Sequence, residues 1–296
     1  MKRSSEYINK GELFLISSPI GNLKDITFRA IEVIKNVDYL FCEDTRVTKK
    51  LLKEYNIDRT LDSFHDYSKG EKEDYIISLL KNNNTVGLIS DAGTPVISDP
   101  GYELVRKSLD LGIKVTPIPG PSAQVSAMIM SGMPIKPYLF YGFLDHKISK
   151  KKSELESLKD YPFSMCFYES PLRINSTIEL MFKIFGERNA TLTREITKLY
   201  EETIEFNLSE YESFPKDLKG EMVLIVEGRK ETIKKDVDII LELTKIINDG
   251  FSLKEATKML SKTTGIKSSE LYNEYLRCKK WKYTHLSQTE AKILSL

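Results

Sequence analysis

The polar segment 90–101, with the sequence SDAGTPVISDPG, has the residue types of a loop that binds a small molecule. It follows the apolar residues 86–89, which we expect to form a buried strand. Ligands of open α/β sheets bind outside the carboxyl ends of the strands, so a small molecule would be expected at this loop. Gly93 permits backbone torsion angles closed to other residues. Asp91 can accept hydrogen bonds from an amine, from a ribose hydroxyl or from its own turn.

Two more loops of small residues follow expected strands, at residues 17–23 and 117–123. None of the three loops matches a Walker A or a GxGxxG phosphate-binding pattern, which disfavours a nucleoside triphosphate or a nicotinamide dinucleotide. Because three strand ends carry such loops, we expect them to form one cofactor pocket. Within segment 90–101, Asp99 and Pro100 are expected to start the next helix as its N-cap and first residue.

Charged residues form three clusters with the chemistry of acid–base catalysis or anion binding. The clusters are residues 43–46, 169–173 and 194–202. In the first of them, Asp44 or Thr45 is expected to cap the following helix. The three histidines stand apart from serine and cysteine motifs, so we assign no catalytic histidine.

Short β-rich runs alternate with amphipathic stretches through the first half of the chain, a pattern typical of an α/β sheet. The expected strands there are residues 12–17, 38–42, 85–90 and 113–117, and the expected helices are residues 27–35, 45–55, 71–81 and 100–111. Two prolines and a glycine within 132–137 predict a linker. Beyond it, expected strands at 138–143, 163–168, 190–194, 199–206 and 221–227, with helices at 149–159 and 172–185, predict a mixed sheet.

The last 67 residues have helical periodicity and no convincing strand. Ser252 to Glu255 predict a capping box at the start of one helix, and Gly265 predicts its end. A second helix at 268–279 completes a helix-turn-helix pattern. We therefore expect an N-terminal α/β domain at 1–132, a mixed α/β domain at 133–229 that completes the cofactor cleft, and a helical C-terminal appendage at 230–296.

The formal net charge of +1 over 296 residues argues against a basic field over the whole chain. The tail from residue 230 onward nevertheless holds 13 lysines and arginines against 9 acidic residues, which leaves 31 against 34 upstream. Such a tail predicts a modest, salt-sensitive attraction to RNA. The three cysteines are widely spaced and lack a CxxC pattern or a nearby histidine, so we expect no disulfide and no metal. No apolar run is long enough to cross a membrane, and we expect a soluble, cytoplasmic protein.

Seven ordered blocks of the sequence resemble the tetrapyrrole-methylase superfamily of S-adenosylmethionine-dependent methyltransferases. The blocks are SPIGNL at 18–23, CEDTR at 42–46, SDAGTP at 90–95 with 97–101, PGPSA at 119–123, YESP at 168–171 with Arg173, TREITK at 193–198 and GE at 220–221. Within the superfamily they are most similar to the branch that 2′-O-methylates a cytidine in the decoding region of 16S rRNA.

The resemblance implies two α/β domains that clamp S-adenosylmethionine between them, usually in a homodimer that acts on 16S rRNA or the small ribosomal subunit. The cofactor-binding residues it implies are Ser18, Pro19, Asp91, Gly93, Thr94, Ile97, Ser122, Ala123 and Tyr168. The candidate general bases for a ribose hydroxyl are Glu43, Asp44 and Glu169. The residues expected to position RNA phosphates are Arg46, Arg173, Arg194 and Lys198.

The chain departs from the family pattern at Ser18, where threonine is expected, at Leu172, where histidine is expected, and at Asp145 and His146, where proline and arginine are expected. One alternative is a methylase of the same superfamily that acts on a corrin, a porphyrin or a diphthine-type substrate. An alternative of another class is a non-enzymatic regulator that binds nucleic acid through its helix-turn-helix. Binding of S-adenosylmethionine distinguishes the enzymes from the regulator.

Overall fold

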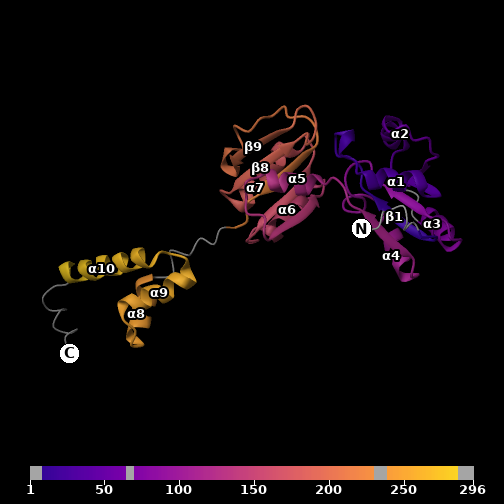
Figure 1. Cartoon of the computed structure of the whole chain (residues 1–296). Helices are drawn as coiled ribbons and strands as arrows, with labels where there is room; N and C mark the ends of the chain where they lie inside the picture. Colours follow the sequence, from indigo (N-terminus) through magenta and orange to yellow (C-terminus); the bar gives the residue numbers. More distant parts are fainter. Residues whose placement is uncertain (1–8, 65–69, 230–238, 286–296) are drawn as a thin grey trace. The chain divides into compact units, whose positions relative to one another are not determined.

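The computed structural model describes residues 9–64, 70–229 and 239–285. The chain divides into two compact units, Met1–Arg229 and Lys230–Leu296 (Figure 1). The first unit contains two five-stranded sheets, and the described part of the second unit contains helices.

The first sheet is parallel throughout, with the strand order β3-β2-β4-β1-β5. Its strands are β1 (Glu12–Ile16), β2 (Tyr39–Cys42), β3 (Asp62–Ser63), β4 (Val86–Ile89) and β5 (Lys114–Ile118). Its helices are α1 (Phe28–Asn36), α2 (Thr45–Glu54), α3 (Glu71–Lys81) and α4 (Tyr102–Asp110), and a 3₁₀ turn, η2 (Leu23–Asp25), follows the β1 loop. The strands and α-helices match the expected ones to within two residues at each end, apart from the two-residue β3, and the sequence pattern predicts neither β3 nor η2.

Helices cover both faces of the first sheet because the side chains of its strands alternate in direction. In β1, Phe14 and Ile16 pack with α1 and α2. Leu13, on the opposite face, packs with α3 and α4. The result is a doubly wound α/β layer in which every parallel strand end points to the same edge.

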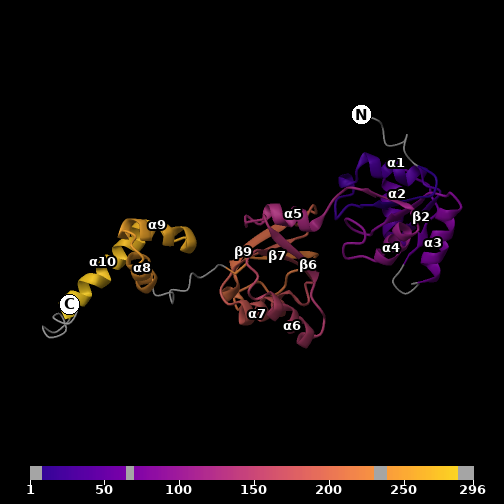
Figure 2. The ribbon, with the colours of Figure 1, turned by 90° about the horizontal axis from the view of Figure 1, so that it is seen from below.

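The second sheet has the order β6-β7-β10-β8-β9, in which β6 is parallel to β7 and the other pairs are antiparallel. Its strands are β6 (Tyr138–Phe143), β7 (Ser164–Glu169), β8 (Asn189–Arg194), β9 (Glu202–Asn207) and β10 (Met222–Val226). Helices α6 (Ile148–Leu158) and α7 (Ile174–Phe185) pack on one face, and α5 (Ala123–Met130) lies on the other (Figure 2). A 3₁₀ turn, η4 (Leu208–Glu210), follows β9. The expected mixed sheet is confirmed.

Helix α5 is absent from the elements that the sequence pattern predicts. Its residues Ala127 and Met128 pack against Cys166, Val223 and Ile225 of the second sheet. The helix precedes the expected linker at 132–137, yet it covers the sheet that follows that linker.

Two local expectations are wrong. Helix α4 begins at Tyr102 after Gly101, which has φ +133°, and no side chain caps it, so Asp99 and Pro100 do not start the helix. Gly101, the one residue between Pro100 and the helix, has a backbone conformation that L-residues avoid, and Asp99 lies beside a cavity. The strand expected at 199–206 begins only at Glu202, because Glu195 and Thr197 have positive φ angles that turn the chain after β8.

The C-terminal unit contains α8 (Ile239–Asn248), α9 (Leu253–Thr264) and α10 (Ser268–His285), which pack around Leu243, Leu260 and Leu271. The predicted capping box is present, since Ser252 and Glu255 each accept a hydrogen bond from the other's backbone N–H. Gly265 ends α9 in the left-handed conformation, as predicted. None of the described helices is long and apolar enough to span a bilayer.

Candidate active site

The loops after β1, β4 and β5 meet the ends of β6, β7 and β10 around a cavity of 370 Å³ in the first unit. From the first half of the chain it is lined by Ile20, Ala92, Gly93, Thr94, Ile97, Ser98, Asp99, Ser122 and Ala123. From the second half it is lined by Phe143, Tyr168, Glu169, Ser170, Pro171, Ile196, Gly220, Glu221, Met222 and Val223. The volume lies in the range of small-molecule sites, and all three loops of small residues contribute to it.

Most of the residues expected to bind the cofactor line this cavity. They are Gly93, Thr94, Ile97, Ser122, Ala123 and Tyr168. Ser18, Pro19 and Asp91 do not line it. Ser18 instead forms a two-way backbone bridge with Gly93, with N···O distances of 2.9 and 3.1 Å. The Asp91 carboxylate accepts a hydrogen bond from the backbone N–H of Asp44 at 2.9 Å, which ties the β4 loop to the β2 loop.

The β4 loop is held in an unusual backbone path beside the cavity. The Ser90 hydroxyl donates to the Gly93 carbonyl at 2.6 Å, and Gly93 has φ +80°. Val96 also has a positive φ, of 73°, which is rare for a β-branched residue. Strain of this kind persists where surrounding contacts fix the chain, and it clusters at ligand sites.

Glu169 lies at the cavity wall, but both of its carboxylate oxygens already have partners. Oε2 accepts from Lys151 Nζ at 3.2 Å and from the Thr177 hydroxyl at 2.7 Å. Oε1 accepts from Arg173 at 2.7 Å and from the Ser170 backbone at 2.8 Å. Because the side chains of Glu169 and Lys151 are only 1% and 6% exposed, this network is a buried support for the 169–171 segment of the wall.

Asp44 and Arg46 are bound to each other outside the cavity lining. The Asp44 carboxylate caps α2 through the Arg46 backbone N–H at 2.8 Å, which confirms its expected capping role. It also forms a two-pronged ion pair with the Arg46 guanidinium. The hydrogen bonds from the side chain and backbone of Arg46 lower the pKa of Asp44 to about 2. Glu43, next to it, follows β2 and also lies outside the cavity lining.

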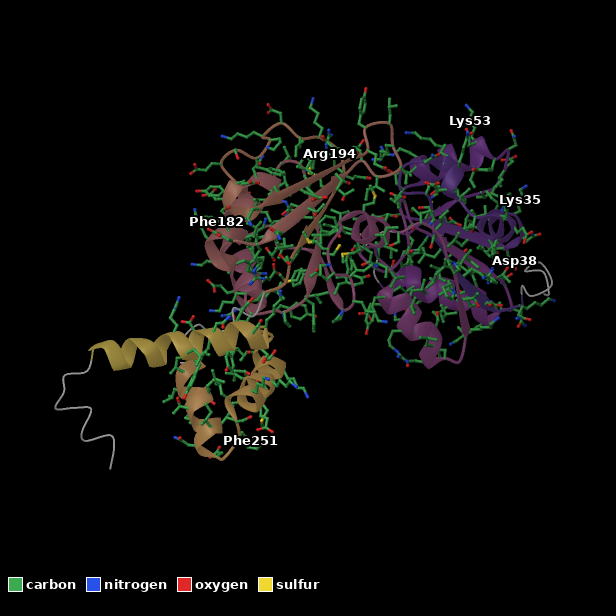
Figure 3. All side chains as sticks on the ribbon, turned by 60° about the vertical axis from the view of Figure 1, so that its left-hand side comes forward. Lys35, Asp38, Lys53, Phe182, Arg194 and Phe251 are labelled. Carbon is green, nitrogen blue, oxygen red and sulfur yellow. The ribbon has the colours of Figure 1, made fainter. Side chains whose placement is uncertain are left out.

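The remaining cations expected to touch RNA are paired within the fold. Arg194, at the end of β8 (Figure 3), binds Glu202 at 2.6 Å and the Lys219 carbonyl at 3.2 Å. Lys198 binds Glu195 at 2.9 Å and Glu221 at 3.0 Å. Arg173 binds Glu169 and also contacts His146 Nδ1 at 2.6 Å. His146, one of the residues at which the chain departs from the family pattern, therefore contacts an arginine that is expected to bind RNA.

Several cavity residues are missing from the sequence-based site. Asp99 was not predicted because the pattern Asp-Pro indicates a helix start, and Phe143 was not predicted because it lies in an expected strand. Gly220 and Glu221 stand in one of the resembling blocks, which is the signal that could have found them.

A scan against protein-family models matches residues 12–212 to the Tetrapyrrole (Corrin/Porphyrin) Methylases. The chain belongs to this family. A curated relative from Halalkalibacterium halodurans, named ribosomal RNA small subunit methyltransferase I, is 40% identical over 275 residues, covering 90% of this chain and 95% of the relative. The relative of the same name from Bacillus subtilis is 40% identical over 274 residues, covering 90% and 94%. That from Rickettsia prowazekii is 41% identical over 234 residues, covering 78% and 84%.

Among solved structures, uroporphyrin-III-C-methyltransferase from Thermus thermophilus has a TM-score of 0.53 and covers 74% of this chain and 94% of that chain. At 16% identity the likeness shows the fold alone. The expected tetrapyrrole-methylase fold is confirmed, and so is the expected enzyme class, an S-adenosylmethionine-dependent methyltransferase. The non-enzymatic regulator is therefore set aside.

The cavity of this methylase fits S-adenosylmethionine on three counts. No lysine or arginine lines it, so it does not favour a polyphosphate. Phe143 and Tyr168, with ring centroids 5.3 Å apart, give it an aromatic side suited to an adenine. Gly93, which lines the cavity with φ +80°, presents backbone without a side chain to a ligand. Among the residues that the structure describes, no cluster of three or more His, Cys, Asp or Glu has a metal-binding arrangement.

Proposed function

We propose that the chain transfers a methyl group from S-adenosylmethionine to the ribose 2′-hydroxyl of a cytidine in the decoding region of 16S rRNA. The observation that carries this proposal is the identity of about 40% over nine-tenths of the chain to relatives named ribosomal RNA small subunit methyltransferase I. The cavity at the strand ends, with its fit to the donor, supports the proposal.

In this proposal the chain accelerates the reaction mainly by positioning the methyl donor and the acceptor oxygen. Bound S-adenosylmethionine supplies a methyl group on a sulfonium, which is electrophilic once it is removed from water. Gly93, Ser122 and Tyr168 would hold the donor, and the apolar Ile20, Ile97 and Val223 would exclude water around it. Alignment of the acceptor oxygen opposite the sulfur then contributes most of the rate.

A ribose hydroxyl is a poor nucleophile, and a carboxylate could remove its proton as the new bond forms. Of the three candidates, Asp44 is bound to Arg46 and Glu169 is bound to Lys151 and Arg173. We propose Glu43, which directly follows β2 in the resembling block 42–46, as the base.

Replacing Asp44 with asparagine is expected to leave the methylation rate within about threefold of wild type, because a carboxylate with a pKa of about 2 is a weak base. Asparagine also keeps an oxygen that can cap α2. Glu43→Gln is expected to lower kcat by about a hundredfold or more. Methyl transfer from a tritiated donor measures both rates. A hundredfold fall in Asp44→Asn together with an unchanged rate in Glu43→Gln would reverse the assignment.

The proposed RNA partner is supported by the surface around the cavity and by the C-terminal unit. Phe143 and Leu172, at or next to the cavity wall, are 55% and 98% exposed, as suits contact with an unstacked base. The Arg46 side chain is 86% exposed, so its guanidinium is accessible to an RNA phosphate. On α9, the exposed Lys254, Lys258 and Lys262 recur at four-residue spacing and so form a stripe along one side of the helix.

Replacing Lys254, Lys258 and Lys262 together with alanine is expected to weaken RNA binding about tenfold at moderate salt and to reduce the slope of log K against log salt by about 2. Affinity for S-adenosylmethionine should not change. A matched control removes three exposed lysines of the first unit, Lys35, Lys53 and Lys81, of which the first two are labelled in Figure 3. Equal loss in the two triple variants would mean that net charge, and not the stripe, attracts RNA.

Tritiated methyl transfer tests the proposed function most directly. Small ribosomal subunits that lack the modification, free 16S rRNA and porphyrin precursors are offered in parallel, and nuclease mapping locates the methyl group. Label on a cytidine ribose supports the proposal. Label on a porphyrin precursor, or on a base, would contradict it and favour another member of the superfamily.

We further propose that the chain works as a cytoplasmic homodimer. Light scattering of the purified chain measures the oligomeric state, and a monomer at working concentration would contradict that part.

A further inference from the structure

We propose that Thr197 is a positioning residue that fastens the two halves of the first unit together beside the cavity and so controls exchange of the methyl donor. Thr197 lies in the turn after β8 and does not line the cavity, so it is not among the residues that would touch the donor. The inference rests on the proposed use of S-adenosylmethionine, because that donor is the ligand whose entry and release this contact governs.

The loop after β1 meets the turn after β8 at one side of the cavity. The Asn22 backbone N–H donates to the Thr197 hydroxyl oxygen at 3.0 Å, across 175 residues of sequence. Ile20 and Ile196, from the same two segments, line the cavity, belong to one hydrophobic cluster and are each 7% exposed. We call the contact between residues 20–22 and residues 196–198 the strap. It joins the half of the unit that carries the first sheet to the half that carries the second.

The two segments of the strap fit together closely at Gly21. A Cβ added to Gly21 would lie 2.6 Å from Lys198 Cγ and 2.8 Å from the Thr197 hydroxyl oxygen, so the segments would have to move apart to admit a side chain there. Lys198 is fixed from the other side, since its ammonium binds Glu195 at 2.9 Å and the cavity residue Glu221 at 3.0 Å. The strap is therefore continuous with the cavity wall.

The backbone of the turn makes the strap dependent on its contacts. Glu195 and Thr197 have φ angles of +51° and +69°, a region that is rare for a β-branched residue. Such a backbone persists only where its surroundings fix it. The Thr197 N–H donates to the Glu201 carboxylate at 2.6 Å, within the turn, whereas the Thr197 hydroxyl binds the other half of the unit. Loss of that hydroxyl releases the turn from the first half.

A ligand in a cavity between two halves is retained only while the halves stay together. Asn22 is exposed, so water can replace Thr197 as the partner of its N–H, and one such hydrogen bond contributes little net stability. The strap can therefore open without unfolding either half, as loops do when they control ligand exchange in other enzymes. Because Thr197 touches neither the sulfur nor the acceptor, its hydroxyl should affect donor and product alike and leave the chemical step unchanged.

Binding and single-turnover kinetics of three variants test the role of the hydroxyl. Thr197→Val keeps the β-branched shape and is expected to raise the Kd of S-adenosylmethionine and of its product S-adenosylhomocysteine about fivefold each, through faster dissociation. The single-turnover rate at saturating donor should stay within about twofold of wild type. Thr197→Ser keeps the hydroxyl and should restore both Kd values. The matched control is Thr203→Val on β9, whose hydroxyl has no hydrogen-bond partner among the described residues.

Gly21→Ala disturbs the same contact from the first half. Gly21 does not have a positive φ, so alanine adds a methyl group without backbone strain, and that methyl should hold the strap apart. Both Kd values are expected to rise at least as much as in Thr197→Val. The double variant should bind no more weakly than Gly21→Ala alone, because the two changes remove one contact.

A disulfide between Asn22→Cys and Thr197→Cys tests opening of the strap directly. Oxidised glutathione accepts the two electrons of the thiol pair, and mass spectrometry confirms the cross-link. Exchange of bound tritiated S-adenosylmethionine is expected to be at least about tenfold slower in the oxidised chain than in the reduced chain. The two chains with a single added cysteine are the controls and should show no such difference.

Several results would overturn the inference. They are unchanged dissociation in Thr197→Val and Gly21→Ala, a cysteine pair that does not form a disulfide, and a disulfide that leaves exchange unchanged. A lower melting temperature of Thr197→Val with unchanged exchange would make the hydrogen bond merely structural. If wild type binds no S-adenosylmethionine at millimolar concentration, the proposed function fails and the inference fails with it. Methyl transfer to an acceptor other than RNA, with exchange still dependent on Thr197, would contradict the proposed function and support the strap.

Discussion

Replacing Glu169 with glutamine is expected to lower the free energy of unfolding of the first unit by about 3–5 kcal/mol. The loss follows from burial, since Lys151 would keep its charge at a site 6% exposed with its counter-ion removed. Arg173 and the Thr177 hydroxyl would lose charge-assisted hydrogen bonds at the same time. Because Glu169 to Pro171 form part of the cavity wall, affinity for S-adenosylmethionine should fall together with stability.

Urea denaturation measures the change, with a probe that reports the first unit. Hydrogen exchange of β7 and β10 amides follows the first unit. Lys152→Met, an exposed neighbour of Lys151 on α6, is the matched control and should cost less than about 0.5 kcal/mol.

A double-mutant cycle distinguishes loss of the Glu169–Lys151 ion pair from other causes of lost stability. If the pair is the cause, adding Lys151→Met to Glu169→Gln should restore part of the lost stability, because the unpaired buried charge is gone. Additive losses would contradict this account. The cycle also bears on catalysis. A rate that recovers with stability in the double variant would exclude Glu169 as the general base.

Features fixed by neighbouring residues could be predicted from the sequence. The Ser252 and Glu255 capping box and the Gly265 end of α9 depend on backbone groups within one helical turn, and both are present. The cap of α2 by Asp44 is of the same kind. Strands such as β4 could be predicted because a run of apolar residues followed by a polar loop is typical of a buried strand.

Features that depend on distant residues could not be predicted in this way. The partners of Glu169 include Lys151 and Thr177, on two other elements, and no spacing rule connects them. Asp91 was expected to face a ligand or its own turn, whereas it holds the backbone of Asp44, 47 residues away. The prediction for Asp99 was wrong for the opposite reason. Its local pattern of Asp before Pro is a strong helix start, but Gly101 turns the chain and leaves the carboxylate at the cavity.

The resemblance to the family supplied what neither local pattern nor spacing contains. It identified the cofactor and marked Ser122 and Tyr168, which line the cavity but come from opposite halves of the first unit. It did not separate residues that face the cavity from those that hold its loops, such as Ser18. That separation requires the path of the backbone, which the order of residues in a loop does not give.

Replacing Gly220 with alanine is expected to lower the free energy of unfolding by about 2–3 kcal/mol and to weaken donor binding about tenfold. Gly220 has φ +92°, and an added Cβ would overlap the Glu195 carboxyl group. That carboxylate cannot simply move away, because it accepts from the Glu221 backbone at 3.0 Å and from Lys198 at 2.9 Å. Its displacement would shift Glu221, a cavity residue, and free Lys198 from one partner.

Two variants separate the overlap from the backbone strain at Gly220. Gly186→Ala, at φ +72° with no atom within 4 Å of the added Cβ, carries strain alone and should cost about 1 kcal/mol without affecting donor binding. In a Glu195→Ala background, Gly220→Ala should likewise cost only about 1 kcal/mol, since the overlapping group is absent. Urea denaturation and calorimetry with S-adenosylmethionine measure the two effects. If Gly220→Ala costs no more than Gly186→Ala in the wild-type background, the close packing of Glu195 against the cavity wall does not fix that wall.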